Sequence, residues 1–372
     1  MLLLLCVVVS GRLRIEGGEI WEGSERIQLA CGSWYGAEQQ DYVPGGLDTQ
    51  PLFGIVGVIR ESLRLNCVRL PVSLELVLHD PGVRPEAVAA NPQLLGLSGM
   101  RVLDAVVAAL KPLYVILDNH VGRANWCCDA RDGEGLWFSR DFSEADWLAG
   151  LEILATRYRV AAIELRNEIR PLIIGDALLE PTWGGAEPDW ASAAERAADV
   201  VLAANPDLLV VVGGLDFGID LRGVRSRPLA IPSDHLLYST HNYVWSCPRC
   251  DTYDDFAKEM NASWGFVRFE RLGAVMLGEF GTPQDTDFSS SDDVQARWWR
   301  WLRAYVQEYH PGISFAYWPI DGTQSPGRTR VRGARETYGL LNTRWNAPAS
   351  EPHLAQVRAW ILNEEGSRVA EL

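Results

Sequence analysis

Short apolar segments recur along the chain, and segments with helical periodicity separate them. The apolar segments are residues 27–31, 67–70, 113–117, 161–165, 208–212, 236–238, 274–277 and 313–317. The helical segments, with apolar residues every three or four positions, include residues 100–110, 147–158, 190–204 and 294–309. A strand followed by a helix, repeated, predicts a parallel sheet. Eight units in 372 residues favour a closed (β/α)8 barrel, or TIM barrel, over an open doubly wound sheet, although the order of elements alone fits both.

The residues before the first apolar segment predict accessory structure. Residues 12–16 and 19–21 alternate apolar and polar side chains around Gly17-Gly18. This pattern predicts a β-hairpin that acts as a small lid. No linker rich in Ser, Thr and Pro follows, so residues 11–372 are interpreted as one barrel domain.

Features near the start and in one loop indicate export. Residues 2–9 are apolar and resemble the core of a secretory signal, but they lack a basic start and the usual length, so residues 1–10 are interpreted as a truncated signal. The segment is too short to span a bilayer, which takes about 20 apolar residues. Asn261-Ala262-Ser263 is a glycosylation sequon. We therefore expect a secreted protein without a membrane span.

The seven cysteines also bear on the compartment and on metal binding. An odd number leaves at least one thiol unpaired in a secreted protein, and Cys67, inside an apolar segment, is the expected buried thiol. Cys247 and Cys250 have the spacing of a short disulfide, a redox pair or half a zinc site. Because no second C-x-x-C motif is present and the adjacent Cys127 and Cys128 have the wrong spacing for zinc, a loop disulfide is favoured.

Composition narrows the class of partner. With 47% hydrophobic and 22% charged residues, the chain has the make-up of a globular protein. Its formal net charge of −15 argues against nucleic acid and anionic membranes, because both require a basic surface. The 15 tryptophans suit a neutral sugar substrate, since indole rings stack on sugars, although most tryptophans in any protein pack in the core.

Polar side chains follow the predicted strands at their carboxyl ends, where a TIM barrel holds its active site. In chain order they are Arg69, Asp118-Asn119-His120, Asn167-Glu168, His241-Asn242-Tyr243, Glu279 and Trp318. Each alone has a structural interpretation, such as an ion pair for Arg69 or a helix cap for Glu168. Six strand ends with such groups are harder to explain by packing. Two carboxylates across a barrel mouth suffice for glycoside hydrolysis.

The same segments carry a resemblance to a known family. They are Cys67-Val68-Arg69-Leu70-Pro71, Leu117-Asp118-Asn119-His120, Leu165-Arg166-Asn167-Glu168, His241-Asn242-Tyr243, Gly278-Glu279-Phe280-Gly281 and Tyr317-Trp318. Each motif is weak alone, but the set in this order, over nearly the whole chain, resembles glycoside hydrolase family 5, the cellulase and mannanase family.

The resemblance implies a role for each residue. Glu168 is the expected acid/base and Glu279 the expected nucleophile, with a second carboxylate about 5 Å away raising the pKa of the acid. Asn167 would hold the sugar 2-hydroxyl. The remaining residues are expected to orient Glu279 (Arg69 and Tyr243), line the central subsite (His120 and His241) and form its floor (Trp318).

Departures from the family pattern leave the substrate open. Arg166 replaces a frequent aromatic residue, Ile169 replaces a frequent proline, and the loops at 121–142 and 170–189 are long. The expected cleft aromatics are Trp34, Trp126 and Trp245.

We expect a monomer that cleaves a β-linked oligo- or polysaccharide, first of all as an endo-β-1,4-glucanase. Mannan, a β-1,3/1,6-glucan and a glucolipid are alternative substrates. A non-catalytic glycan-binding barrel would lack one glutamate, and both are present. A metallohydrolase is disfavoured because the two histidines lie in motifs that need no metal, so neither a metal nor an organic cofactor is expected.

Overall fold

The computed structural model describes residues 12–129 and 131–361. The segment interpreted as a truncated signal, residues 1–10, lies outside them. Within the described chain, no helix combines the length and the apolar character needed to cross a bilayer.

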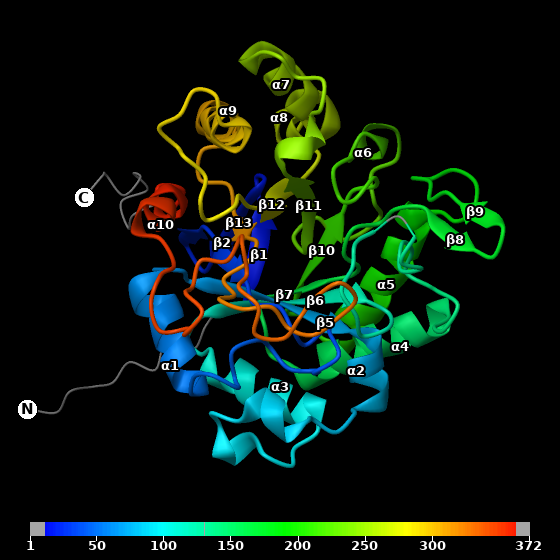
Figure 1. Ribbon diagram of the computed structural model, residues 1–372. Coiled ribbons are helices and arrows are strands. Elements are labelled where there is room, and N and C mark those ends of the chain that lie inside the picture. Colours follow the sequence, from blue (N-terminus) through cyan, green and yellow to red (C-terminus); the bar gives the residue numbers. More distant parts are fainter. Residues whose placement is uncertain (1–11, 130, 362–372) are drawn as a thin grey trace, which may run out of the picture.

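Eight parallel strands form a closed barrel, which Figure 1 shows with its surrounding helices. The strands are β4 (Ala30–Ser33), β5 (Cys67–Ser73), β6 (Tyr114–Val121), β7 (Ala162–Glu164), β10 (Leu209–Gly213), β11 (Leu236–Asn242), β12 (Ala274–Phe280) and β13 (Phe315–Tyr317). Each predicted apolar segment overlaps one of them. β13 pairs with β4 and closes the ring, so the (β/α)8 barrel is confirmed.

The strands are apolar throughout because both of their faces are buried. In β10, Leu209 and Val211 belong to the cluster inside the barrel. Val210 and Val212 point the other way and belong to the cluster between the barrel and its helices. Such continuous apolar runs are typical of parallel strands covered on both sides.

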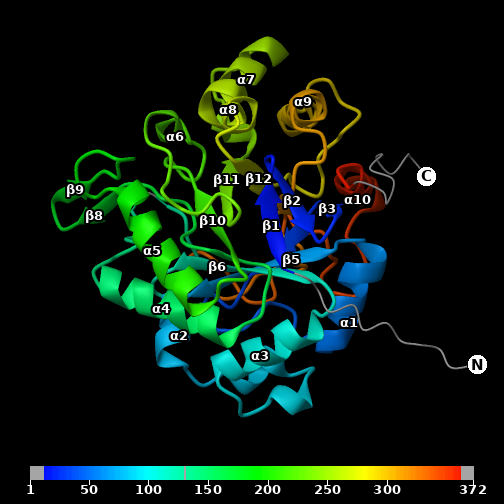
Figure 2. The same ribbon diagram turned by 180° about the vertical axis from the view of Figure 1, so that it is seen from behind.

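Helices follow every barrel strand and cover the outside of the barrel (Figures 1 and 2). They are α1 (Leu52–Gly57), α2 (Leu74–His79), α3 (Gly99–Ala109), α4 (Glu144–Arg157), α5 (Trp190–Ala204), α6 (Gly223–Ser226), α7 (Tyr253–Met260), α8 (Phe266–Phe269), α9 (Val294–Tyr309) and α10 (Glu351–Arg358). The four predicted helical segments correspond to α3, α4, α5 and α9. The start of α4 is fixed by a capping box between Ser143 and Asp146.

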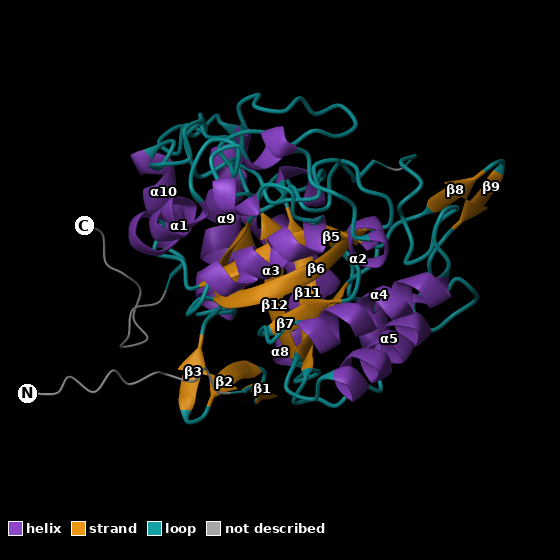
Figure 3. Cartoon of the chain, turned by 90° about the horizontal axis from the view of Figure 1, so that it is seen from below, coloured by secondary structure: helices purple, strands orange, loops and turns teal. Residues whose placement is uncertain are grey.

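The predicted N-terminal hairpin is present, but it belongs to a three-stranded sheet. β1 (Leu13–Glu16) pairs with β2 (Glu19–Glu22), and β2 pairs with β3 (Glu25–Ile27). Leu13 and Ile20 are buried in one cluster with residues from the first positions of the barrel strands. Figure 3 shows the sheet on the opposite side of the barrel from the long loops. The expected lid therefore closes the amino end of the barrel and leaves the mouth uncovered.

Three disulfides lie within the described residues. The expectation that Cys67 is a free thiol is wrong, because Cys67 is bonded to Cys31. The barrel register places these two residues opposite each other on β4 and β5, a proximity that the sequence separation of 36 hides. Cys247 is bonded to Cys250. The adjacent cysteines, Cys127 and Cys128, are also bonded to each other.

Two long loops rise from the carboxyl end of the barrel, as the sequence indicates. One connects β6 to α4 and contains the Cys127–Cys128 disulfide. The other connects β7 to α5 and contains a small hairpin of β8 (Leu172–Ile174) and β9 (Ala177–Leu179). Both loops therefore stand beside the mouth of the barrel.

Candidate active site

A cavity of about 320 Å³ opens at the carboxyl end of the barrel. Its lining includes many of the predicted residues, and its members are His120, Trp126, Cys127, Cys128, Asn167, Glu168, Tyr243, Trp245, Glu279, Trp318, Arg330, Glu336, Thr337 and Tyr338. Arg69 and His241 are buried and contact the two glutamates from the barrel side. Side chains that are distant in sequence thus meet at one site.

Glu279, on β12, is held by a cation and a hydroxyl. Arg69 donates a hydrogen bond to its Oε1 at 2.7 Å, and the Tyr243 hydroxyl donates to its Oε2 at 3.1 Å. Arg69 also contacts the carboxylates of Glu164 and Asp118 at 2.7 and 3.0 Å. Although burial alone would lower the pKa of Arg69, the three carboxylates keep it well above the usual range. The guanidinium and the hydroxyl together fix the orientation of the Glu279 carboxyl group.

Glu168 follows β7 in a left-handed backbone conformation, with φ at 40°. This conformation is uncommon outside glycine and is typical of functional positions. Arg170 donates a hydrogen bond to the backbone carbonyl of Glu168 at 2.7 Å and so helps to fix it. Burial raises the pKa of Glu168 to about 7, against the lowering effect of Arg170 and Arg69. The main cause is therefore burial rather than the second carboxylate that sequence reasoning invoked.

The two carboxylates lie close together with His241 between them. An oxygen of Glu168, an oxygen of Glu279 and a ring nitrogen of His241 all lie within 4.8 Å of one another. Nδ1 of His241 is 3.0 Å from Glu168 and 3.7 Å from Glu279. Burial lowers the pKa of His241, so its ring is neutral at pH 7. With its hydrogen on Nδ1, a neutral imidazole can donate one hydrogen bond, to the nearer carboxyl group of Glu168.

Asn167 and His120 form the neighbouring wall. Oδ1 of Asn167 accepts a hydrogen bond from Arg69 at 2.8 Å, so the amide nitrogen faces the cavity side. That nitrogen lies 3.5 Å from Nε2 of His120. Nδ1 of His120 contacts Asp118 at 2.6 Å, and burial lowers the pKa of His120 well below its usual value. The wall thus presents uncharged polar groups suited to sugar hydroxyls.

Aromatic rings next to His120 form another part of the cavity lining. The Trp318 ring is nearly parallel to the rings of His120 and Tyr35, with centroids 5.5 Å away in both cases. Trp126 lies 6.2 Å from Trp318, and the Arg330 guanidinium covers its ring at 3.5 Å. Trp318 and Trp126 both line the cavity and offer apolar faces to a sugar ring.

Of the three expected cleft aromatics, Trp34 is wrongly assigned. Its side chain is fully buried, and its indole N–H donates to the carbonyl of Gly45. Trp34 belongs to the main hydrophobic cluster, where its ring packs beside the segment around Gly45, and it does not line the cavity. Trp245 does line the cavity; it is 56% exposed and stacks on Tyr243 with 4.6 Å between ring centroids.

Sequence reasoning missed two parts of the cavity. The loop after β13 contributes Arg330, Glu336 and Tyr338, and no motif in that loop points to the site. Cys127 and Cys128 also line the cavity. Two adjacent cysteines can form a disulfide with each other, so the Cys-Cys pair in this long loop is a signal in the sequence that could have indicated this part of the cavity.

Among the residues that the structure describes, two groups of side chains have enough donor atoms for a metal ion. One is Glu168, His241 and Glu279. There the Arg69 cation bonded to Glu279 opposes a second positive charge. The other is His120 with Cys127 and Cys128, whose sulfurs are joined in a disulfide and so are not thiolates. The expectation that no metal is required stays a prediction.

A comparison with known protein families identifies the family of this chain. The sequence profile described as Cellulase (glycosyl hydrolase family 5) matches residues 59–324. The chain belongs to glycosyl hydrolase family 5. The resemblance inferred from the motifs is confirmed, and the matched span contains every predicted site residue from Arg69 to Trp318.

Relatives within family 5 are similar over most of the chain. An endoglucanase of Paenibacillus polymyxa is 26% identical and covers 92% of this chain and 86% of its own length. A major extracellular endoglucanase of Xanthomonas campestris pv. campestris is 31% identical over 86% of this chain. The chain spans 65% of that protein, less than two thirds. A Pyrococcus horikoshii endocellulase, solved with cellotetraose, shares the fold with a TM-score of 0.79 and 23% identity, covering 93% of this chain and 97% of its own.

Proposed function

We propose that this family 5 protein is a retaining β-glycosidase that uses two glutamates, and more specifically an endo-β-1,4-glucanase. One observation carries the proposal: a carboxylate oxygen of Glu168 and a carboxylate oxygen of Glu279 lie within 4.8 Å of each other at the barrel mouth. Carboxyl groups of retaining enzymes are about 5–5.5 Å apart, whereas inverting enzymes leave about 6.5–9.5 Å for a water molecule.

In the first step, a Glu279 oxygen attacks the anomeric carbon while Glu168 donates its proton to the departing glycosidic oxygen. The C–O bond to the leaving sugar breaks, and a glycosyl ester of Glu279 forms. In the second step, the Glu168 carboxylate takes a proton from water as that water attacks the anomeric carbon. The ester bond breaks, Glu279 leaves as a carboxylate and Glu168 is protonated again.

The surroundings support unequal roles for the two glutamates. Arg69 and Tyr243 both donate to Glu279, which suits an anionic nucleophile. Glu168, with a pKa of about 7, carries a proton over much of the neutral range, which suits the acid. Asn167, beside Glu168 in the sequence, would hold the sugar 2-hydroxyl.

The substrate assignment rests on relatives that are endoglucanases and on the neighbour with bound cellotetraose. Wild-type protein is therefore expected to hydrolyse carboxymethylcellulose and cello-oligosaccharides faster than mannan or β-1,3/1,6-glucan, and to release the β-anomer first. A panel of β-glycans with proton NMR of fresh product tests both points. First release of the α-anomer would contradict retention, and a preference for another glycan would contradict the glucanase assignment.

Trp318 is expected to form the floor of the subsite at the cleavage point, because it lines the same cavity as Glu168 and Glu279. Trp318→Ala should weaken transition-state binding by about 1–3 kcal/mol, as other stacking platforms do, whereas Trp318→Tyr should lose less. Trp183→Ala, a half-buried tryptophan outside the cavity lining, is the control. Wild-type kcat/KM in folded Trp318→Ala would exclude this role.

The proposal also covers where the enzyme acts and its oligomeric state. The disulfide Cys247–Cys250 lies in an exposed loop, as in proteins of oxidising compartments, and the Xanthomonas relative is described as extracellular. These observations support a secreted enzyme. That the enzyme is a monomer stays a prediction. Light scattering of purified protein measures the oligomeric state directly.

A further inference from the structure

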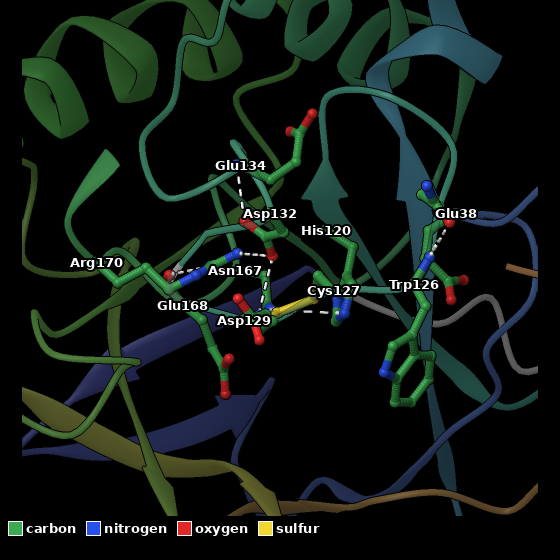
Figure 4. Close-up of a disulfide and its surroundings, with 12 residues drawn as sticks. Glu38, His120, Trp126, Cys127, Asp129, Asp132, Glu134, Asn167, Glu168 and Arg170 are labelled. Atoms are coloured by element: carbon green, nitrogen blue, oxygen red, sulfur yellow. Dashed lines mark hydrogen bonds and ion pairs between the residues drawn. A yellow bond between two sulfur atoms is a disulfide. The ribbon is translucent and has the colours of Figure 1, made fainter. Parts of the chain in front are cut away.

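The disulfide between the adjacent cysteines, Cys127 and Cys128, lies in the candidate active site rather than in the scaffold. Both residues line the cavity that holds Glu168 and Glu279. Figure 4 shows Cys127 beside His120 and Asn167. Cys127 is 8% exposed and Cys128 is partly exposed, so a small reagent can reach the bond from the cavity.

The disulfide contacts the amide group of Asn167. Nδ2 of Asn167 lies 3.4 Å from the sulfur of Cys128 and 4.0 Å from that of Cys127. On the other side of the amide, Oδ1 accepts from Arg69 at 2.8 Å. The Asn167 side chain is therefore contacted by a guanidinium at its oxygen, and by the pair of sulfurs together with Nε2 of His120 at its nitrogen.

The loop that carries the disulfide is also tied to the backbone of the acid/base residue (Figure 4). Asp132, four residues after Cys128, forms a buried ion pair with Arg170 at 2.6 Å. Arg170 in turn donates to the Glu168 carbonyl at 2.7 Å. A shift of this loop would reach both Asn167 and Glu168.

We propose that the Cys127–Cys128 disulfide is a positioning element for Asn167, so that its redox state sets the rate of glycoside cleavage. The inference rests on the proposed function, in which Asn167 holds the sugar 2-hydroxyl. A dithiol reductant transfers two electrons and two protons to the disulfide, breaks the S–S bond and becomes a cyclic disulfide itself. The two separate thiols then no longer form one surface against the Asn167 amide.

Reduction of the Cys127–Cys128 disulfide is expected to lower the catalytic rate more than the stability of the fold. Hydrogen bonds to the 2-hydroxyl strengthen in the transition state of glycoside hydrolysis. A small displacement of a positioned group lowers the rate strongly, so reduction should decrease kcat/KM by about 10-fold, mainly through kcat. The Cys31–Cys67 disulfide is fully buried and should not react with the reagent.

The test compares dithiothreitol sensitivity of the wild type and two double variants on an aryl β-cellobioside, with thiol counting to follow reduction. Wild type and Cys247→Ser/Cys250→Ser, which lacks the loop disulfide, should both lose activity on reduction and regain it on reoxidation. Cys127→Ala/Cys128→Ala should have the activity of reduced wild type from the start, and dithiothreitol should not change it. Melting temperature, measured in parallel, identifies a folding defect; should the alanine pair fold poorly, reduction and reoxidation of wild type still test the inference.

A second substrate separates positioning from general loosening of the loop. On the 2-deoxy analogue of the aryl β-cellobioside, which has no 2-hydroxyl, reduced and oxidised wild type should turn over equally. Equal rates of both forms on the parent substrate, or an equal loss on both substrates, would overturn the inference while leaving the two-glutamate function intact. No turnover of the parent substrate by oxidised enzyme would instead refute the proposed function.

Discussion

Glu279→Ala is expected to lower turnover of cello-oligosaccharides by at least about 10⁴-fold, because the variant lacks the atom that forms the glycosyl ester. With an activated aryl β-cellobioside, added azide should restore activity. Azide enters the space left on the α-face, so the product should be the α-glycosyl azide. Product configuration by NMR is the measurement.

The control for this variant is Glu164→Gln, which alters another carboxylate bonded to Arg69 while leaving Glu279 in place. Although this change also perturbs Arg69, it should not allow formation of an α-azide. If Glu279→Ala kept most wild-type activity on a natural glycan, the assignment of the nucleophile would have to be given up.

Glu168→Ala is expected to hydrolyse natural glycans about 10²- to 10⁴-fold more slowly than wild type, because a general acid usually contributes that much to the rate. An aryl glycoside whose leaving group needs no proton should still glycosylate Glu279. Azide should then accelerate release and give the β-glycosyl azide, the opposite configuration from the Glu279 variant. Glu168→Gly is a useful companion, because glycine adopts the positive φ of this position without strain.

The pH profile provides an independent check on Glu168. Its pKa is raised to about 7, so the acid is protonated below that value and loses its proton as the pH rises through it. For wild type, kcat/KM on an unactivated substrate should therefore fall on the alkaline side with a midpoint near 7. The Glu168→Ala variant should lack this alkaline limb when it is assayed on the activated substrate. An alkaline limb that persisted there would assign the titration to another group.

The barrel was predictable because its signal is periodic and local. Apolar segments long enough for one strand alternate with amphipathic helices, and α5 and α9 agree with their predicted bounds. The place of the N-terminal sheet was not predictable, since the apolar side chains of β1 and β2 suit either end of a barrel. The Cys31–Cys67 pairing was also hidden, because it depends on the register between the neighbouring strands β4 and β5.

The site was predictable where residues directly follow strands. Glu168 comes shortly after β7 and Glu279 lies near the carboxyl end of β12, and the chain topology brings them together. The same rule failed for Trp34, whose ring turns into the core instead of toward the mouth. It also could not reach Arg330, because a side chain from a long loop after β13 is placed by tertiary contacts such as its stacking on Trp126.

The N-terminal sheet has a practical consequence for handling the enzyme on solid material. It covers the end of the barrel that faces away from the cavity (Figure 3). A surface linker or reporter protein joined to the outer side of this sheet, for example near Arg14 on β1, would orient every immobilised molecule with its cavity toward the bulk solution. Attachment through the loop at 323–335 would instead turn the cavity toward the support and block long, insoluble chains from entering.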